Sequence, residues 1–326
     1  MSLKMERKGS EMFVDERRFA TDRRPWFGQL PERIGKNFTF AVMGDRCGMA
    51  LPGVFEKGLA ILQDLKPDFV LFVGDLVEGY GMDSEEARNE WEYIDAQIAA
   101  TGLPFFQTIG NHDFGTQTLV DVWRERKGIE YYAFRVGDVL FLILNTEDPF
   151  EELSDELIAR VKLAAANIRR DPERASEYVK AFDDEVVASM SPDQLQDVGK
   201  ARVGLGDEQL AFFENVLASN ADAKYTFVSM HKPGWKSDSS SFARLREMIG
   251  SRPHTIFAGH FHSLEYSRTN EACQIQLGRT GAASHGEGKG DQNLLLWVSM
   301  RSGVPSIRVV HLDGITEPAD YPPRHP

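Results

Sequence analysis

The sequence predicts an α/β fold in which two mixed β-sheets pack together between layers of helices. From residue 38 onward, short apolar segments of strand character alternate with segments of helical periodicity, the pattern of layered α/β proteins. A hairpin within residues 131–144 and three β-rich segments near the C-terminus add more strands than one parallel sheet would hold. Two packed sheets would accommodate all of them in one domain.

The first half of this pattern contains three strand–loop units with helices between them. Each predicted strand is a short apolar run that ends at a glycine followed by a polar residue, as buried strands do where they enter a loop. The helix over residues 55–65 has helical spacing and stops just before Pro67, because the residue before a proline disfavours the helical conformation. The other elements predicted here are strands at residues 38–43, 69–73 and 105–109, a helix at residues 91–100, and hairpin strands at residues 131–136 and 139–144.

The alternation resumes after residue 203 and then gives way to β-rich segments. Leu210, Phe213 and Leu217 are spaced as on one face of a helix over residues 206–219. The elements predicted after it are strands at residues 225–230 and 254–258 with a helix at residues 242–249 between them, followed by strands at residues 272–277, 294–300 and 306–311 and a glycine-rich link at residues 281–290.

Two segments fall outside the alternation. Residues 1–36 have few aliphatic residues and no sustained period, which predicts an N-terminal surface arm; alternatively, Trp26 and Phe27 pack this arm on a neighbouring subunit. Residues 147–203 are charged, alanine-rich and helix-prone, which predicts a helical insertion within a domain that spans residues 37–326. The insertion either caps one face of the functional site or is a peripheral excursion with no role in it.

The composition is that of an ordinary globular protein, with 42% hydrophobic and 27% charged residues. A net charge of −13 argues against nucleic acid as the main partner, although a local cationic or metal site can still bind a small phosphorylated substrate. The sequence has neither an apolar run of membrane-helix length nor the apolar core of a signal peptide. With only two cysteines, Cys47 and Cys273, it fits a protein of the reducing cytoplasm. Nothing in the composition indicates an oligomeric state.

Residues that can bind metal occur at the ends of five predicted strands. The loops beyond the carboxyl ends of strands converge in open α/β sheets. The first three of these residues are about 30–36 positions apart, the length of one βαβ unit, so successive parallel strands would present them side by side. The strand-end residues are Asp45, Asp75, Asn111, His231 and His260, and His262 follows two positions later.

Each of these residues also has an ordinary structural explanation. A strand-end aspartate commonly caps a turn or a helix, Gly110-Asn111 is a turn signal, and a single histidine can be a hydrogen-bonded core residue. Their occurrence at five strand ends favours a metal centre instead. Carboxylate, amide and imidazole ligands suit Mn, Fe or Zn, and six such groups fit two ions that share one carboxylate better than one four-coordinate site.

The order of these segments resembles that of the calcineurin-like metallophosphoesterases. The resemblance runs from about residue 38 to 285, and its most specific parts are Gly110-Asn111-His112-Asp113 and Gly259-His260-Phe261-His262. It implies a four-layer α/β/β/α sandwich, with two central sheets between helices. It also implies a dinuclear centre of Mn or Fe, with Zn as an alternative, that hydrolyses phosphomonoesters or phosphodiesters.

The resemblance also implies roles for individual residues. Asp75 corresponds to the family's bridging carboxylate, Asp45 and His262 would bind the first metal, and Asn111, His231 and His260 would bind the second. His112 would approach the scissile phosphate and protonate the leaving oxygen. Asp113 either orients His112 or caps the following turn, and we expect the second.

Cys47 is a departure from the family pattern. The family's first motif is usually Asp-x-His, and its histidine also binds the first metal, but here the segment is Asp45-Arg46-Cys47. Cys47 is a thiolate ligand, or a buried inert residue with another group completing the site, or the mark of a weak first site.

Substrate-binding residues are less clearly marked. Arg46 and Arg279 are candidates to pair with a substrate phosphate, which a guanidinium group suits well. An ordinary surface charge is the alternative for Arg46. We expect His285 to be a loop histidine and Lys232 to be a surface residue.

The sequence therefore predicts a metal-dependent phosphoesterase acting on a small or medium organic phosphate. Nuclease activity is disfavoured by the acidic balance and by the absence of a basic stripe with interleaved aromatic residues. The alternative from another class is a metal-binding scaffold that lost turnover through the Cys47 change and binds a partner through its insertion.

Overall fold

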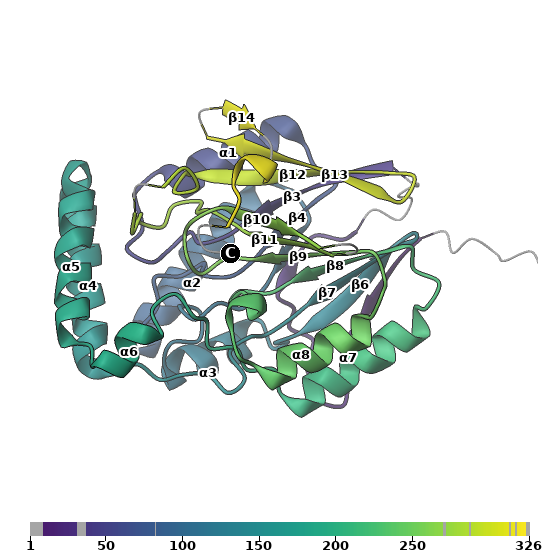
Figure 1. Cartoon of the computed structure of the whole chain (residues 1–326), viewed down its shortest axis with the longest axis horizontal. Coiled ribbons are helices and arrows are strands. Elements are labelled where there is room, and N and C mark those ends of the chain that lie inside the picture. Colours follow the sequence, from purple (N-terminus) through teal and green to yellow (C-terminus); the bar gives the residue numbers. More distant parts are fainter. Residues whose placement is uncertain are drawn as a thin grey trace, which may run out of the picture.

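The computed structural model of the chain describes residues 9–30, 37–81, 83–269, 272–286, 288–312, 314–316 and 318–323. Within these residues, two seven-stranded mixed sheets pack face to face, and helices cover their outer faces (Figure 1). This architecture confirms the predicted four-layer α/β/β/α sandwich.

The first sheet has the strand order β14-β13-β12-β3-β4-β5-β2. At its centre lie three parallel strands, β3 (Asn37–Met43), β4 (Phe69–Phe72) and β5 (Phe105–Gln107). Antiparallel pairing extends the sheet on both sides with β12 (Leu294–Arg301), β13 (Val304–His311), β14 (Gly314–Thr316) and β2 (Trp26–Phe27).

The second sheet has the strand order β1-β6-β7-β8-β9-β11-β10. Its parallel part is β7 (Val139–Ile143), β8 (Tyr225–Ser229), β9 (His254–Ala258) and β11 (Ala272–Gln276). Antiparallel partners complete it, namely β6 (Tyr132–Val136), β1 (Ser10–Phe13) and β10 (Glu265–Arg268). The predicted hairpin is thus β6–β7, with its turn at Gly137-Asp138.

The core between the sheets follows from side-chain alternation along the strands. In β3, Phe38 and Phe40 point into the space between the sheets, whereas Ala41 and Met43 face the helices outside. Phe40 stacks on Phe69 of β4, with ring centroids 5.1 Å apart, and meets Phe227 of β8 edge to face at 5.0 Å. These aromatic contacts fix one sheet against the other, and so set the relative positions of the loops at their ends.

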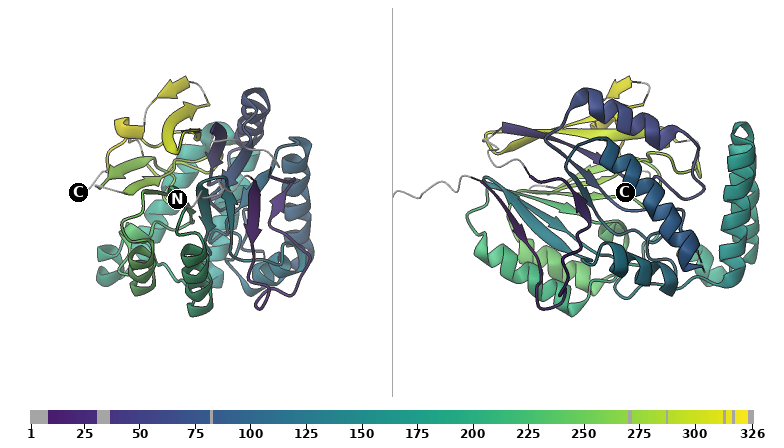
Figure 2. Two further views of the ribbon diagram at one scale, coloured as in Figure 1. Left: turned by 90° about the vertical axis from the view of Figure 1, so that its right-hand side faces the viewer. Right: turned by 180° about the vertical axis from the view of Figure 1, so that it is seen from behind.

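Helices on the two outer faces close the sandwich (Figure 2). Helices α1 (Val54–Leu65), α2 (Ser84–Ala100) and α3 (Gln117–Arg126) bury Leu62, Trp91 and Trp123 against the first sheet. Helices α7 (Asp207–Ser219) and α8 (Ser240–Ile249) bury Phe213 and Leu245 against the second. Helix α2 begins seven residues before the predicted start, because its first turns are mostly charged and show little apolar periodicity. Helix α3 and strand β10 were not predicted.

The segment expected to be a surface arm is partly built into the sheets. Residues 1–8 and 31–36 lie outside the described residues. Between them, β1 pairs with β6 and β2 pairs with β5. Trp26, which we considered as a contact to a neighbouring subunit, instead packs on Phe106 and Tyr132 of its own chain, with ring centroids 6.4 and 4.9 Å away.

The predicted insertion contains the helices α4 (Asp155–Arg170), η1 (Pro172–Arg174), α5 (Ala175–Ser189) and α6 (Pro192–Gln196). Helices α4 and α5 form a pair that stands at one end of the sandwich (Figure 1). Its apolar side packs on Met49, Tyr80 and Ala283. These residues belong to the loop after β3, the loop after β4 and the glycine-rich link, so the insertion touches the loops that carry candidate metal ligands.

Among the described residues, none of the helices combines the length and the apolar composition needed to cross a membrane.

Candidate metal centre

The predicted ligands come together where the parallel strands of both sheets end. Asp45, Asp75 and Asn111 follow β3, β4 and β5, His231 follows β8, and His260 follows β9. Because strands of both sheets are parallel here, their carboxyl ends meet at one edge of the sandwich. The strand-end pattern in the sequence therefore describes a real convergence in space.

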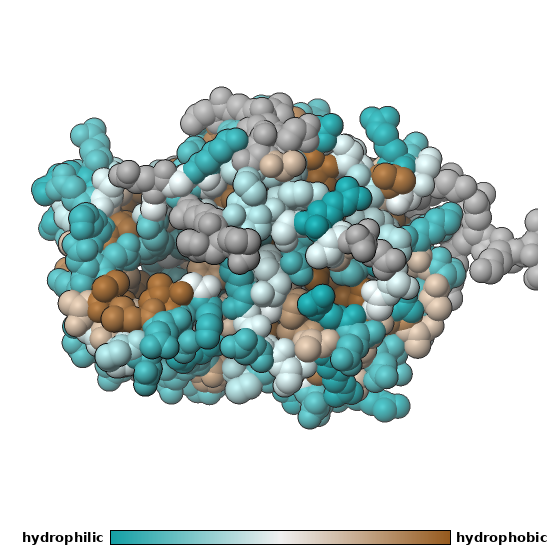
Figure 3. All heavy atoms as spheres, viewed as in Figure 1, coloured by the Kyte–Doolittle hydropathy of each residue, from teal (hydrophilic) through white to brown (hydrophobic). Residues whose placement is uncertain are grey.

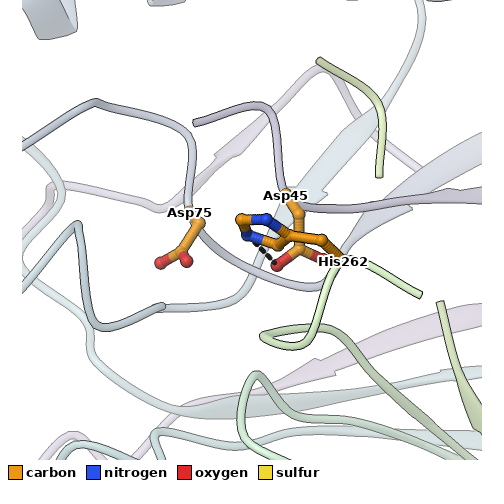
Figure 4. A group of neighbouring side chains, drawn as sticks. All are labelled: Asp45, Asp75 and His262. Carbon is orange, nitrogen blue, oxygen red and sulfur yellow. Dashed lines mark ion pairs between the residues drawn. The ribbon is translucent and has the colours of Figure 1, made fainter. Parts of the chain in front are cut away.

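Asp45, Asp75 and His262 form one group at this edge. Their side chains approach one another from three different loops (Figure 4). One ligand atom from each lies within 4.8 Å of the others, and His262 Nε2 is 3.7 Å from Asp45 Oδ1. All three residues are buried. Two carboxylates and an imidazole at this spacing can hold a divalent cation.

A second group of candidate ligands contacts Asp75 through His231. His231 Nε2 is 3.0 Å from Asp75 Oδ2 and 2.9 Å from Asn111 Oδ1. His260 Nδ1 is 2.8 Å from the same Asn111 oxygen. Asp75 is thus close to members of both groups and can serve both, as a bridging carboxylate would.

Backbone carbonyls fix the orientation of three histidine rings. The Nδ1 atoms of His231, His262 and His112 lie 2.9, 2.9 and 2.7 Å from the carbonyl oxygens of Val73, Ala283 and Glu78. The carbonyl accepts the Nδ1–H of each ring, so Nε2 is the nitrogen that can bind a metal or exchange a proton. Metal-binding histidines are commonly held in this way.

The burial of the carboxylates fits the binding of cations. Asp45 Oδ1 accepts the backbone N–H of His260 at 2.7 Å, whereas Asp45 Oδ2 is buried with no hydrogen-bond partner among the described residues. A buried carboxylate oxygen without a partner is unfavourable unless a cation compensates it. The donor set of carboxylates, one amide oxygen and imidazoles is that of a borderline-hard metal.

Four of the candidate ligands have left-handed backbone conformations. The φ angles of Asp45, Asp75, His260 and His262 are 51°, 64°, 78° and 53°. Each such non-glycine residue costs on the order of 1–2 kcal/mol. Strain of this kind persists where the surrounding structure enforces it, and it commonly marks functional sites.

Two glycines allow the loops to approach the carboxylates closely. A Cβ atom at Gly110 would collide with the carboxylate of Asp75, and one at Gly259 would collide with that of Asp45. The Gly-Asn-His-Asp and Gly-His-x-His segments therefore need glycine for a steric reason.

The candidate ligands differ in the direction of their pKa shifts. Burial raises the pKa of Asp45 to about 7, in spite of the nearby His231. Burial also acts to raise the pKa of Asp75, but His231 and His112 hold that pKa well below its usual range. Burial acts to lower the pKa of His231, and the adjacent Asp75 carboxylate instead raises it to about 9. Burial lowers the pKa of His262 to about 3.

The side chain of Asp113 binds the backbone of the ligand loops and does not orient the His112 ring. Its carboxylate accepts the backbone N–H groups of Leu76 and Asp75 at 2.9 and 3.0 Å, of Gly110 at 2.9 Å and of Val77 at 3.3 Å. Our expectation that it caps a following turn is therefore too narrow. It ties the loop after β4 to the loop after β5, and so holds Asp75 beside Asn111.

The remaining candidates adjoin the ligand loops, and the backbone N–H groups of Arg46 and Cys47 donate to the Asp75 carbonyl at 3.0 and 3.2 Å. Cys47 is fully buried, burial raises its pKa well above the usual range, and its sulfur is not part of the ligand group found among the described residues. Arg46 donates to the Leu76 carbonyl at 2.9 Å and lies 3.8 Å from Glu90. Arg279 is buried and donates to the His262 carbonyl at 3.5 Å.

Two residues that we placed on the surface or in a loop have defined contacts. Lys232 is buried, and its Nζ lies 2.6 Å from Glu147 Oε2, so the surface assignment is wrong. His285 Nδ1 lies 3.0 Å from Asp183 of α5.

Glu78 is a residue of the site that the sequence did not indicate. Its carboxylate accepts the N–H groups of Met49 and Ala50, and its carbonyl orients His112. Its position three residues after Asp75 is the one signal that could have drawn attention to it.

Comparison with known proteins agrees with this geometry. The family model of the calcineurin-like phosphoesterases matches residues 38–264. The serine/threonine-protein phosphatase CPPED1 of Mus musculus is 34% identical over 112 residues, which are 32% of this chain and 35% of that protein. CPPED1 of Danio rerio is 27% identical over 46% of this chain and 50% of that protein. The chain thus spans about a third to a half of the length of these relatives.

Solved structures show the same fold. A dimetal phosphatase from Danio rerio superposes with a TM-score of 0.53 over 86% of this chain and 96% of that one, at 13% identity. PhoD superposes with a TM-score of 0.53 over 86% of this chain and 71% of that one, also at 13% identity. At this identity the likeness concerns the fold alone.

Proposed function

The chain belongs to the calcineurin-like phosphoesterase family, and from this premise we propose that it hydrolyses phosphomonoesters or phosphodiesters of a small or medium organic phosphate at a dinuclear metal centre. The observation that carries the proposal is that Asp75 is shared by two groups of ligand atoms. It clusters with Asp45 and His262, and it contacts His231, which in turn lies beside Asn111 and, through it, His260.

Each proposed metal would have its own ligand set. Asp45, Asp75 and His262 would hold the first ion, and Asp75, Asn111, His231 and His260 the second. Two bound ions, divalent or trivalent and of Mn or Fe, with Zn as the alternative, would supply polarisation of the phosphoryl oxygens and activation of water. The protein's part is to hold the ligands with the carbonyl-fixed imidazoles and with Asp113.

His112 is the proposed general acid. Its backbone N–H donates to Asp75 Oδ1 at 2.9 Å, and its Nδ1–H is bound to the Glu78 carbonyl at 2.7 Å. The ring is therefore fixed beside the ligand cluster, and Nε2 is the atom that would carry a proton to the leaving oxygen.

A turnover assay with a generic aryl phosphate tests this proposal. We expect hydrolysis that depends on added Mn²⁺ and is abolished by a chelator. Phosphopeptides form a second substrate panel, because the curated relatives are named serine/threonine-protein phosphatases. Bound metal with no hydrolysis of any ester would favour the metal-binding scaffold instead.

Metal affinity is expected to rise with pH between 6 and 8. The proposed metal needs neutral His231, whose pKa is about 9, and ionised Asp45, whose pKa is about 7. Protons therefore compete with the metal below these values, by up to about tenfold per pH unit for each proton displaced. Calorimetric titration of the metal-free protein with Mn²⁺ at pH 6, 7 and 8 measures this, and a pH-independent affinity would contradict the ligand assignment.

Cys47→Ser is expected to leave the metal content unchanged. The thiol is buried outside the ligand group, which supports the inert alternative for Cys47. The substitution should lower the free energy of unfolding by about 1 kcal/mol, because it buries a hydroxyl. Metal analysis and thermal unfolding check both effects. Loss of one metal ion in Cys47→Ser would instead establish a thiolate ligand.

A further inference from the structure

A cavity of about 200 Å³ opens directly beside the second proposed metal group. Asn111, His260 and Tyr80 form its wall on the side of the metal ligands. The opposite wall comes from the base of the insertion and includes Lys200 and Arg202. This volume is about that of seven water molecules in the liquid, enough for a small anionic group.

Three of the residues that line this cavity are cationic. Lys200, Arg202 and Lys232 line it, and Glu151 is the one carboxylate among its lining residues. Each of the three cations is paired with a carboxylate, Lys200 with Asp197, Arg202 with Glu151 and Lys232 with Glu147. Nothing in the metal chemistry requires these cations, because the proposed ions neutralise the scissile phosphate themselves.

We propose that Lys200 and Arg202, beside Lys232, form a second anion subsite that selects phosphoesters whose alcohol portion carries a further phosphate or carboxylate. The inference rests on the proposed function and specifies its substrate class. The subsite adjoins Asn111 and His260, so an anion bound there would be joined through a short linker to the phosphate at the metals.

A substrate anion could readily displace the carboxylates that now pair with Lys200 and Arg202. Lys200 lies 2.9 Å from Asp197 and 3.7 Å from Asp238, and Arg202 pairs with Glu151. The side chains in these pairs are 46–92% exposed. Exposed pairs contribute little stability, so exchanging Glu151 for a substrate anion costs little.

Lys232 has a different position from the other two cations. Its side chain is 8% exposed, its partner Glu147 is 2% exposed, and their contact is 2.6 Å. Glu147 also bridges to Gly204 at the other root of the insertion. Lys232 therefore fixes the base of the insertion, and with it the positions of Lys200 and Arg202 relative to the metal ligands.

A larger hollow of about 720 Å³ continues from the same residues and gives room for the rest of a substrate. It shares Lys200, Arg202, Lys232 and Glu151 with the smaller cavity, and it adds the apolar Met190 and Val198 together with Asp197 and Asp238. Val198 is 60% exposed, and a patch of apolar side chains gathers on the surface at this end of the molecule (Figure 3).

The test compares matched substrates and variants of the full-length protein. The probes are alkyl phosphates of two to four carbons whose far end carries a methyl group, a carboxylate or a second phosphate. We expect the native protein to hydrolyse the phosphate-ended or carboxylate-ended esters with a higher kcat/KM than the methyl-ended ester. In the double variant Lys200→Ala/Arg202→Ala, this preference should fall about tenfold, with the methyl-ended ester changing less than about twofold.

Glu151→Gln is expected to increase the preference for anion-ended esters, the opposite of the effect of the double variant. It removes the carboxylate that competes for Arg202, so the preference should rise by about threefold. Arg174→Ala is the matched control, because it removes an exposed, paired cation of the same insertion that does not line the cavity. It should leave the preference unchanged.

The outcomes separate the subsite from the catalytic proposal. Equal hydrolysis of all the esters by the native protein, or equal losses for all of them in the double variant, would overturn the subsite and leave the phosphoesterase intact. Hydrolysis of none of them would overturn the proposed function, and the subsite with it. If the native protein has a higher kcat/KM than for the methyl-ended ester only with the carboxylate-ended esters, or only with the phosphate-ended ones, that group is the anion that the subsite binds.

Discussion

Asp75→Asn is expected to lower kcat for phosphoester hydrolysis by roughly a thousandfold, equivalent to about 4 kcal/mol of transition-state stabilisation. Asp75 belongs to both ligand groups, because it lies 3.0 Å from His231 Nε2 and within 4.8 Å of the ligand atoms of Asp45 and His262. An amide keeps the shape of the side chain but removes the charge that both proposed ions share. Both sites should therefore lose affinity together.

Asp68→Asn is the matched control for this substitution. Asp68 lies just before β4, at the opposite end of the strand from Asp75, and its carboxylate accepts the Thr39 N–H at 2.7 Å. It should change kcat by less than about twofold, since it lies at the far end of the strand from the ligands. Steady-state kinetics and metal analysis of both variants test whether Asp75 bridges the two proposed ions. Full activity in Asp75→Asn would refute a bridging role.

Asp113→Ala is expected to cost about 3 kcal/mol or more of the free energy of unfolding and to weaken metal binding. Removing the carboxylate deprives four backbone N–H groups of their acceptor, in the loops after β4 and β5. A buried donor left without a partner costs about 1–3 kcal/mol, and water can compensate some of the four. The released loops no longer hold Asp75 beside Asn111, so affinity falls although no proposed ligand has changed.

Asp83→Ala is the matched control, because it measures how much an exposed capping carboxylate contributes to the free energy of unfolding. Asp83 caps α2 by accepting the N–H groups of Glu85 and Glu86 on an exposed surface. Its loss should cost about 1 kcal/mol and leave metal affinity unchanged. Denaturant unfolding and Mn²⁺ titration measure both variants. An Asp113→Ala protein as stable as Asp83→Ala would show that the hydrogen bonds of Asp113 do not organise the centre.

The strands that carry the candidate ligands were predictable because their signals are local. A buried strand such as β4 is a continuous apolar run, and the glycine and aspartate that follow it are adjacent in the sequence. The steric need for Gly110 beside Asp75 makes the Gly-Asn-His-Asp segment distinctive. Strand prediction and ligand prediction thus draw on the same short segments.

What escaped prediction depends on partners that are distant in the sequence. Strand β2 has only two residues, too few for any periodicity, and it forms because Trp26 finds Phe106 and Tyr132. Lys232 looked like a surface residue because Glu147, its buried partner, lies 85 positions away. The role of Asp113 likewise depends on which backbone N–H groups the fold brings to it.

Anomalous diffraction from crystals of the protein grown with Mn²⁺ tests the central claim most directly. Two peaks should lie at the carboxyl ends of β3, β4, β5, β8 and β9, with Asp75 touching both. One peak should contact Asp45 and His262, and the other should contact Asn111, His231 and His260. A single peak, or peaks that do not touch Asp75, would contradict a dinuclear centre built on the ends of these strands.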